Sequence, residues 1–203
     1  AFQLKFTHPF TSNLININGT GYFSANDGTN GVELWKTDGT AGGTALVKDI
    51  MPGSSGSFPT DLINIGGIIY FQATDGVNGY ELWKTDGTAE GTAMVKDINP
   101  GSGDSNPLSL VNVGGTVYFR AHDDANGNEL WKTDGTAEGT AMVKDINPGE
   151  YNSSPDYLIN INGIIYFSAY DDINGTELWK SDGTAAGTVM VKDIYPGWDS
   201  NPE

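Results

Sequence analysis

The chain lacks cysteine throughout its 203 residues, and two other reactive side chains are scarce. Without cysteine there are no disulfides, thiolate metal sites or cysteine nucleophiles. Arginine occurs once, at Arg120, whereas a sialidase-like propeller needs several arginines for its acidic sugar. Histidine occurs only at His8 and His122, and neither lies near a recognisable catalytic triad. The sequence therefore predicts no catalytic residue and a protein that is not an enzyme.

Positive charge is also scarce. Ten lysines and arginines stand against 26 acidic residues, which gives a formal net charge of −16. A nucleic-acid binder needs a basic stripe to displace counterions, and an anionic membrane surface attracts basic segments. No apolar run approaches the roughly 18 residues of a membrane span. We therefore expect no nucleic-acid partner and no membrane insertion, and cations or neutral molecules are the easier ligands.

Helical periodicity is absent, and a long tandem repeat takes its place. The segment ELWKTDGTAEGTAMVKDINPG at 81–101 recurs unchanged at 129–149, and looser copies begin at Glu33 and Glu177. The period is 48 residues, which is typical of solenoids, propellers and arrays. It divides the chain into repeats at 14–61, 62–109, 110–157 and 158–203.

Each repeat contains four short apolar runs separated by Gly, Asp and Asn. In the first repeat they lie at 14–18, 22–25, 33–37 and 45–50, and an Asn-Gly or Gly-Gly pair between the first two predicts a tight primed turn. Pairs such as Tyr22-Phe23 and Leu34-Trp35 make both sheet faces apolar, so both faces should be buried. The pattern predicts an all-β fold, a β-propeller built from four 48-residue four-stranded repeats. A solenoid β-helix is the less favoured alternative.

Residues 1–13 fall outside the clean repeats. Ala1–Phe6 alternates like a strand and loosely echoes the fourth strand of each repeat. Unpaired sheet edges recruit strands, so this segment is expected to pair with an edge in the same chain and close the ring, or with a neighbouring chain. The first residue is Ala1 rather than Met, which indicates either a removed leader or a cut boundary.

The string ELW-DGT-GT-VKDI-PG resembles the bacterial ELWxxDGT repeat family and, more distantly, the Asp-box turn of other propellers. The resemblance covers residues 14–203. It implies a propeller-like fold in secreted or surface-exposed bacterial proteins, and it implies no known activity. We therefore expect a secreted or cell-surface location.

An acidic loop before each ELW motif is the first candidate site. Asp and Asn oxygens spaced around glycines can surround Ca²⁺, which takes six to eight oxygen ligands. The alternative is that these residues only form turns, since Asp and Asn tolerate left-handed backbone. The candidate metal ligands are Asp27, Asn30, Glu33, Asp75, Asn78, Glu81, Asp123, Asn126, Glu129, Asp171, Asn174 and Glu177.

Other repeated positions are expected to be structural. They are the Asp of each DGT turn (Asp38, Asp86, Asp134, Asp182), the strand Trp (Trp35, Trp83, Trp131, Trp179) and the first-strand Asn (Asn16, Asn64, Asn112, Asn160). The Asn residues are expected to line a central channel or to bond the neighbouring blade. Tyr151 and Trp198 break the repeat in loops, so they are the better candidates for exposed ligand contacts.

Three functional hypotheses follow. The first is a non-enzymatic extracellular binding propeller, lectin-like or adhesin-like, stabilised by Ca²⁺ and bound to a glycan or another surface ligand. The second is a structural subunit of a surface layer, matrix or filament that self-assembles with copies of itself through its N-terminal strand. The third is a glycoside-active enzyme or a fragment of one, because paired carboxylates are plentiful.

Overall fold

The computed structural model describes residues 14–202, so the expected strand at Ala1–Phe6 lies outside the described part of the chain. Sixteen strands form four four-stranded antiparallel sheets, one for each repeat. The second, third and fourth sheets begin at residues 60, 108 and 156, two residues before the repeat starts expected at 62, 110 and 158, and each repeat is counted from here on by its sheet. The strands are β1 (Ile15–Ile17), β2 (Thr20–Asn26), β3 (Val32–Thr37), β4 (Ala45–Lys48), β5 (Thr60–Ile65), β6 (Ile68–Thr74), β7 (Tyr80–Thr85), β8 (Ala93–Lys96), β9 (Leu108–Val113), β10 (Thr116–Asp123), β11 (Gly127–Thr133), β12 (Ala141–Lys144), β13 (Asp156–Ile161), β14 (Ile164–Asp171), β15 (Gly175–Ser181) and β16 (Val189–Lys192). Within 14–202 no helix is long and apolar enough to cross a membrane.

The strands of each sheet follow one another in chain order, as in β1-β2-β3-β4. The first hairpin turns through Asn18 and Gly19, with φ values of 51° and 90°, and the second turns through Gly66 and Gly67, at 61° and 94°. Positive φ at both central residues is the mark of a type I′ turn, which suits the twist of paired strands. The predicted primed turns are therefore confirmed.

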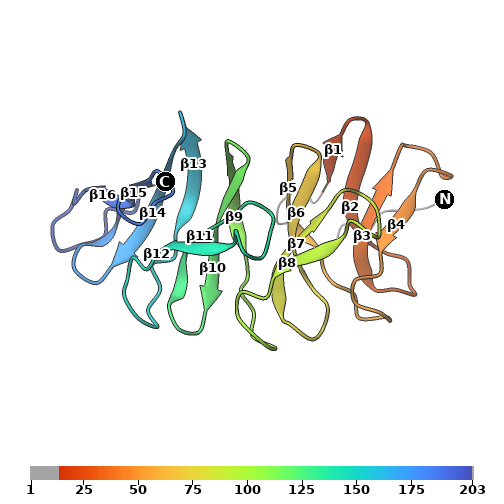
Figure 1. Ribbon diagram of the computed structural model, residues 1–203, viewed down its shortest axis with the longest axis horizontal. Helices are drawn as coiled ribbons and strands as arrows, with labels where there is room; N and C mark the ends of the chain where they lie inside the picture. Colours follow the sequence, from red (N-terminus) through yellow and green to blue (C-terminus); the bar gives the residue numbers. More distant parts are fainter. Residues whose placement is uncertain (1–13, 203) are drawn as a thin grey trace.

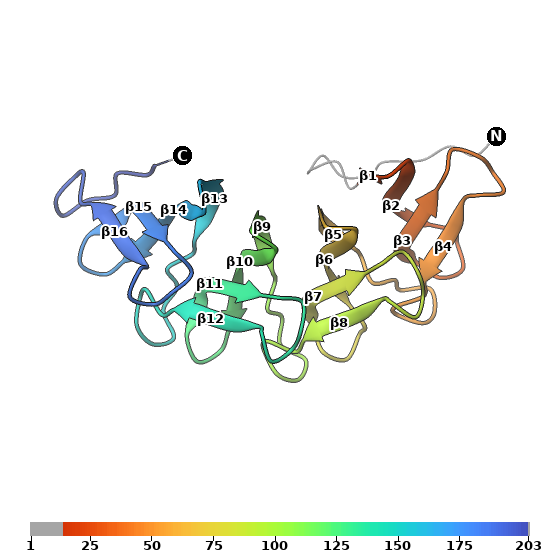
Figure 2. The ribbon, with the colours of Figure 1, turned by 45° about the horizontal axis from the view of Figure 1, so that its top comes forward.

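The four sheets stand side by side along an open arc. Figure 2 shows the first strands β1, β5, β9 and β13 on the concave side and the fourth strands β4, β8, β12 and β16 on the convex side. The two ends of the described chain lie at opposite ends of the arc (Figure 1). Neighbouring sheets therefore meet through their faces, as blades do.

The hydrophobic core lies between consecutive repeats. In the first junction, Tyr22, Leu34 and Val47 of the first repeat pack with Phe71 and other residues of the second. The next two junctions repeat this arrangement with the equivalent residues. Phe71 is fully buried. Both faces of the second and third sheets are therefore covered by a neighbour, as the sequence predicts, whereas the first and fourth sheets each have one covered face. Stability comes from stacking repeats.

Lysine side chains add polar links across the same junctions. Lys36 Nζ donates to the carbonyl oxygen of Gly87 at 2.7 Å, and Lys48 Nζ donates to that of Thr92 at 2.7 Å. The same bonds recur one and two repeats later, as Lys84–Gly135, Lys96–Thr140, Lys132–Gly183 and Lys144–Thr188. This explains why eight of the nine lysines occupy two repeat positions.

Candidate functional site

The acidic loops form compact turns around their first aspartate. Asp27 Oδ1 accepts hydrogen bonds from the backbone N–H groups of Thr29 and Asn30, both at 2.8 Å, and Oδ2 accepts one from Asn30 Nδ2. The loops at Asp75, Asp123 and Asp171 have the same bonds. Hydrogen bonds from Asn30 and Thr29 lower the pKa of Asp27. This is the side-chain turn that Asp commonly makes with backbone two and three residues on.

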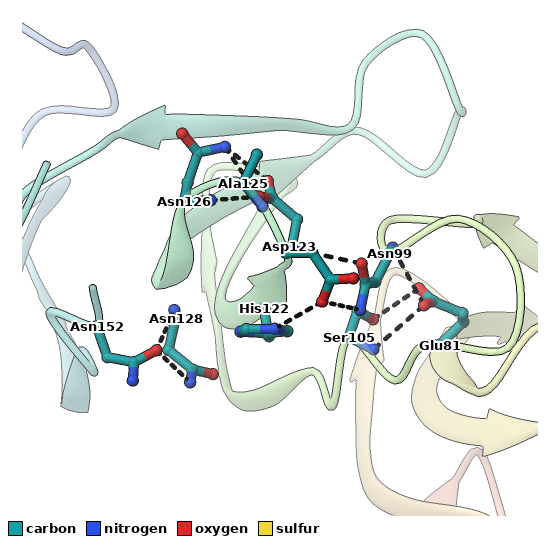
Figure 3. Close-up of polar contacts among 10 residues, drawn as sticks. Glu81, Asn99, Ser105, His122, Asp123, Ala125, Asn126, Asn128 and Asn152 are labelled. Carbon is teal, nitrogen blue, oxygen red and sulfur yellow. Dashed lines mark hydrogen bonds and ion pairs between the residues drawn. The ribbon is translucent and has the colours of Figure 1, made fainter. Parts of the chain in front are cut away.

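The glutamate expected to complete each cation site points to a different place. Glu81 is fully buried at the junction with the next repeat. Its carboxylate accepts a hydrogen bond from Ile98 N at 3.0 Å. It also accepts hydrogen bonds from Ser105 N at 3.2 Å and Ser105 Oγ at 2.6 Å (Figure 3). Glu33, Glu129 and Glu177 bond to Ser57, Ser153 and Ser200 in the same way. In each loop the predicted Asp and Asn therefore bond to each other, whereas the predicted Glu bonds to other residues at the junction.

No set of three or more acidic or histidine side chains within residues 14–202 is arranged to hold a metal ion. The calcium site stays a prediction, and the loops use their Asp and Asn oxygens for turns. The structural role of the glutamates was missed from the sequence. The signal for it was the serine that follows the first three glutamates after 24 residues, at Ser57, Ser105 and Ser153, and follows Glu177 after 23, at Ser200.

The buried glutamates predict a pH-dependent stability. Burial raises the pKa of Glu81 and of Glu129 to about 7, above the ordinary value of 4.5. The folded state therefore holds these protons more tightly than the unfolded state, and this contribution is full below pH 4.5 and is lost as the pH rises through 7. Asp27 and Asp38 have pKa values lowered from the ordinary 3.8, so their contribution to the stability of the folded state is lost only at pH values below 3.8. We expect the thermal midpoint to be highest near pH 4.5 and to fall toward pH 8.

Thermal unfolding across this range at low salt and at high salt would check the prediction. Salt screens the repulsion among the surface charges but affects buried carboxyl groups much less. A decline that persists at high salt would support the buried glutamates as its cause. A midpoint that is flat or rises between pH 4.5 and pH 8 would contradict the prediction.

The other repeated positions have structural contacts. Asp38 Oδ1 accepts hydrogen bonds from Thr40 N at 2.9 Å and Thr40 Oγ1 at 2.7 Å, which closes the DGT turn. Trp83 is only 7% exposed and belongs to the first core cluster. The first-strand Asn residues bond to the glycine of their own hairpin turn, as Asn64 does to Gly67 N at 3.0 Å. Asn160 also reaches the neighbouring repeat, where it donates to the carbonyl oxygen of Asn112 at 3.0 Å.

The two residues predicted for ligand contact are both exposed. Tyr151 is 63% exposed and lies in the link between β12 and β13. Trp198 is 67% exposed, follows β16, and stacks on Tyr195 with ring centroids 6.4 Å apart. Neither residue lines the pocket described next.

A polar pocket of about 300 Å³ lies between the third and fourth repeats. Its lining residues are Arg120, Ser153, Ser154, Asp156, Tyr157, Ser168, Tyr170, Thr176, Asn201 and Pro202. None of these residues was a sequence-based candidate. The signal that could have identified them is variation between repeats that are otherwise nearly identical. Three such columns are Ser24, Gln72, Arg120 and Ser168; Asn26, Thr74, His122 and Tyr170; and Asp61, Ser109 and Tyr157.

The pocket brings together opposite charges and two tyrosines. Arg120 Nη1 lies 3.9 Å from Asp156 Oδ2, and Ser109 Oγ donates to Asp156 Oδ1 at 2.8 Å. Arg120 lies in β10 and Ser109 in β9, so these contacts connect two strands of the third sheet with β13 of the fourth. Tyr157 is 58% exposed and Tyr170 is 37% exposed, so both rings remain available to a ligand.

Tyr157 occupies a left-handed backbone conformation that its counterparts Asp61 and Ser109 share, with φ values of 54° and 56°. Its φ is +54°, in the left-handed region that an ordinary side chain enters only at a cost of roughly 1–3 kcal/mol. The pairing of β13 with β14 shifts register between Asp156 and Ile159, which marks an irregularity of the bulge type. Bulges redirect side chains and are common beside binding sites. The tyrosine is therefore held beside the pocket by an irregular strand.

The same region one repeat earlier is occupied by the chain's own polar groups (Figure 3). His122, the counterpart of Tyr170, has its Nε2 3.3 Å from Asp124 Oδ1. Asp124 in turn bonds to Asn99, whose Nδ2 donates to Asp124 Oδ1 at 3.2 Å. His122, Asp124 and Asn99 thus bond to one another at this junction, although His122 Nδ1 is buried without a hydrogen-bond partner. The third and fourth repeats line a pocket instead.

Comparisons with known proteins bear on the fold. No protein-family model matches the chain, and no curated protein matches it. The resemblance to the ELWxxDGT repeat family therefore stays a prediction.

Solved structures are similar to the chain at low sequence identity. The computationally designed Ika8 protein is 16% identical with a TM-score of 0.51, over 90% of this chain and 49% of that one. A structure from a study of two prolyl endopeptidases is 10% identical with a TM-score of 0.53, over 85% of this chain and 24% of that one. Prolyl oligopeptidase B from Galerina marginata is 10% identical with a TM-score of 0.51, over 86% of this chain and 25% of that one.

The chain thus spans about half the length of the designed protein and about a quarter of each peptidase. At these identities the likeness concerns the fold alone. Together with the four stacked sheets it identifies the chain as an all-β protein with the β-propeller fold, in four four-stranded blades.

Proposed function

We propose that the chain is a non-enzymatic extracellular binding propeller whose ligand is a neutral, carbohydrate-like molecule held between the third and fourth repeats. The observation that carries the proposal is the position of sequence variation. Residues 81–101 and 129–149 are identical, yet the three columns that contain Arg120, Tyr157 and Tyr170 of the pocket differ from repeat to repeat. Variation that spares the scaffold and gathers at a pocket is what a binding surface requires.

The pocket chemistry fits a sugar. A tyrosine ring offers an apolar face and a polar tip, and binding sites combine such surfaces with a few well-placed polar groups. Tyr157 and Tyr170 supply the rings, and Arg120, Asp156 and Ser168 supply donors and acceptors. Asp156 already offsets the charge of Arg120, and the chain carries a net charge of −16, so a neutral ligand is favoured over an anionic one.

The pocket also favours binding over hydrolysis. Glycoside hydrolysis usually needs two carboxyl groups on either side of the scissile bond. Among the described residues that line the pocket, Asp156 is the single carboxylate, and it is paired with Arg120. The extracellular location in the proposal rests on the ELWxxDGT resemblance.

Binding to a glycan array, followed by titration of the best sugar, would test the proposal. The chain's own repeats supply replacements that the fold already accepts at each position: Arg120→Gln, Tyr157→Ser and Tyr170→Thr. We expect each to weaken binding at least about tenfold, since loss of a buried contact costs on the order of 1.4 kcal/mol or more. Tyr151→Gly, which copies Gly103 of the previous repeat, is the matched control and should leave the affinity unchanged.

Two results would overturn the proposal. One is the absence of any glycan ligand, and the other is binding that survives all three pocket substitutions but is lost in the Tyr151→Gly control. Turnover of a polysaccharide in the same assay would favour the alternative of a glycoside-active enzyme.

A second candidate function is a self-assembling structural subunit. It is favoured by a separate observation, the two apolar faces at the ends of the arc, which carry the next inference.

A further inference from the structure

The fourth repeat exposes a face that is buried in every earlier repeat. Val95 and Ile98 are each 5% exposed, whereas their counterparts Val191 and Ile194 are 45% and 56% exposed. Tyr118 and Leu130 are buried in the third junction, and their counterparts Tyr166 and Leu178 are only partly covered. We call this surface the front face and define it by Tyr166, Leu178, Val191 and Ile194.

The first repeat exposes the complementary surface. Trp83 and Gly87 are buried under the preceding repeat, whereas their counterpart Trp35 is partly exposed and their counterpart Gly39 is exposed. Thr92 is 1% exposed, and its counterpart Thr44 is only partly covered. We call this surface the back face and define it by Trp35, Gly39, Thr44 and Leu46, which are all partly or largely exposed.

The polar groups of the two faces match as well. Each internal junction is crossed by two lysine bonds, such as Lys84 to the Gly135 carbonyl and Lys96 to the Thr140 carbonyl. The equivalent lysines of the front face, Lys180 and Lys192, are exposed. By the same repeat spacing, their acceptors are the carbonyl groups of Gly39 and Thr44, which belong to the back face.

From these matches we infer that the front face of one chain binds the back face of a second copy. This contact reproduces the internal junction, which the chain itself forms three times. It is heterologous, because two different surfaces meet, so it closes a ring or extends a filament according to the curvature. The arc in Figure 2 turns both ends toward the same side, which favours closure of a ring by a small number of copies. In the contact, Lys180 donates to Gly39 and Lys192 to Thr44 of the second copy.

Mass in solution, measured by light scattering across a concentration series, tests this inference directly. The unchanged protein is expected to have the mass of two or more chains. Ile194→Asp on the front face and Leu46→Asp on the back face should each give a monomer. Ile194 is 56% exposed within one chain, so its change should leave the monomer folded, as an unchanged thermal midpoint of the monomer would show. Ile173→Asp, at an 86% exposed position in a loop of the same repeat, is the control and should associate like the unchanged protein.

Mixing the two monomeric variants separates this contact from other kinds of dimer. The Ile194→Asp chain keeps an intact back face, and the Leu46→Asp chain keeps an intact front face. An equimolar mixture should therefore form a complex of one chain of each kind, held by a single junction. The inference is wrong if the unchanged protein is a monomer at every concentration, if either variant still associates alone, or if the mixture stays monomeric. None of these results depends on whether a glycan binds.

Discussion

Ile98→Ala is expected to lower the free energy of unfolding by about 2–5 kcal/mol, the usual cost of removing a large aliphatic side chain from a packed core. Ile98 is 5% exposed in the second core cluster, between the second and third repeats. Tight packing leaves a cavity that the surroundings fill only partly. Chemical denaturation, measured on the single chain, gives the loss directly.

The chain offers a matched control for this substitution. Ile194 occupies the same place in the fourth repeat and is 56% exposed. Ile194→Ala should cost roughly 1 kcal/mol or less in the monomer, since much of the side chain is already in water. To remove the effect of association, both changes are compared in the Leu46→Asp background. Similar losses at the two positions would show that the space between repeats is not the core.

Glu81→Ala is the second change with a large expected effect, a loss of at least about 3 kcal/mol at neutral pH. The substitution leaves buried donors of Ile98 and Ser105 without acceptors, and each unsatisfied buried group costs on the order of 1–3 kcal/mol. Because the carboxylate connects β7, the end of the KDI segment and the link to the next repeat, its loss should loosen the whole junction.

Asp75→Ala separates this structural role from a role in a cation site. Asp75 accepts three hydrogen bonds within its own loop, from Val77 and Asn78. Water can replace these bonds at the surface, so the expected loss is about 1 kcal/mol or less. If Glu81 and Asp75 both bound a Ca²⁺ ion, the two Ala substitutions would lower the free energy of unfolding by similar amounts when Ca²⁺ is present. Both losses would then become smaller when a chelator removes the ion. Unfolding curves with and without Ca²⁺ distinguish the two outcomes.

The fold was predictable because its signals are local and repeated. Alternating apolar residues, Asn-Gly and Gly-Gly turns and the 48-residue period define four strands per repeat, and apolar pairs such as Tyr22-Phe23 indicate burial on both faces. Trp83, Trp131 and Trp179 were correctly assigned to the core, whereas Trp35 is partly exposed at the end of the arc. The DGT turns were correctly expected to be structural.

The site was less predictable because its residues meet only across a junction. Glu81 lies next to an acidic loop in sequence, and it was therefore grouped with Asp75 and Asn78. Its partner Ser105 lies 24 residues later and comes close only when the link folds back. Arg120 and Tyr157 also belong to different sheets. Both positions vary between repeats, so a search for residues that recur every 48 positions does not select them.

The uniform junction has a consequence for how such a protein can change over time. Every boundary uses the same apolar side chains and the same two lysine bonds, so a whole repeat can be gained or lost with both new neighbours already compatible. The variable columns that line the pocket lie outside this shared set. The number of repeats and the ligand preference are therefore governed by separate residues. After a duplication, the pocket residues of the new repeat can change while its junction residues stay the same.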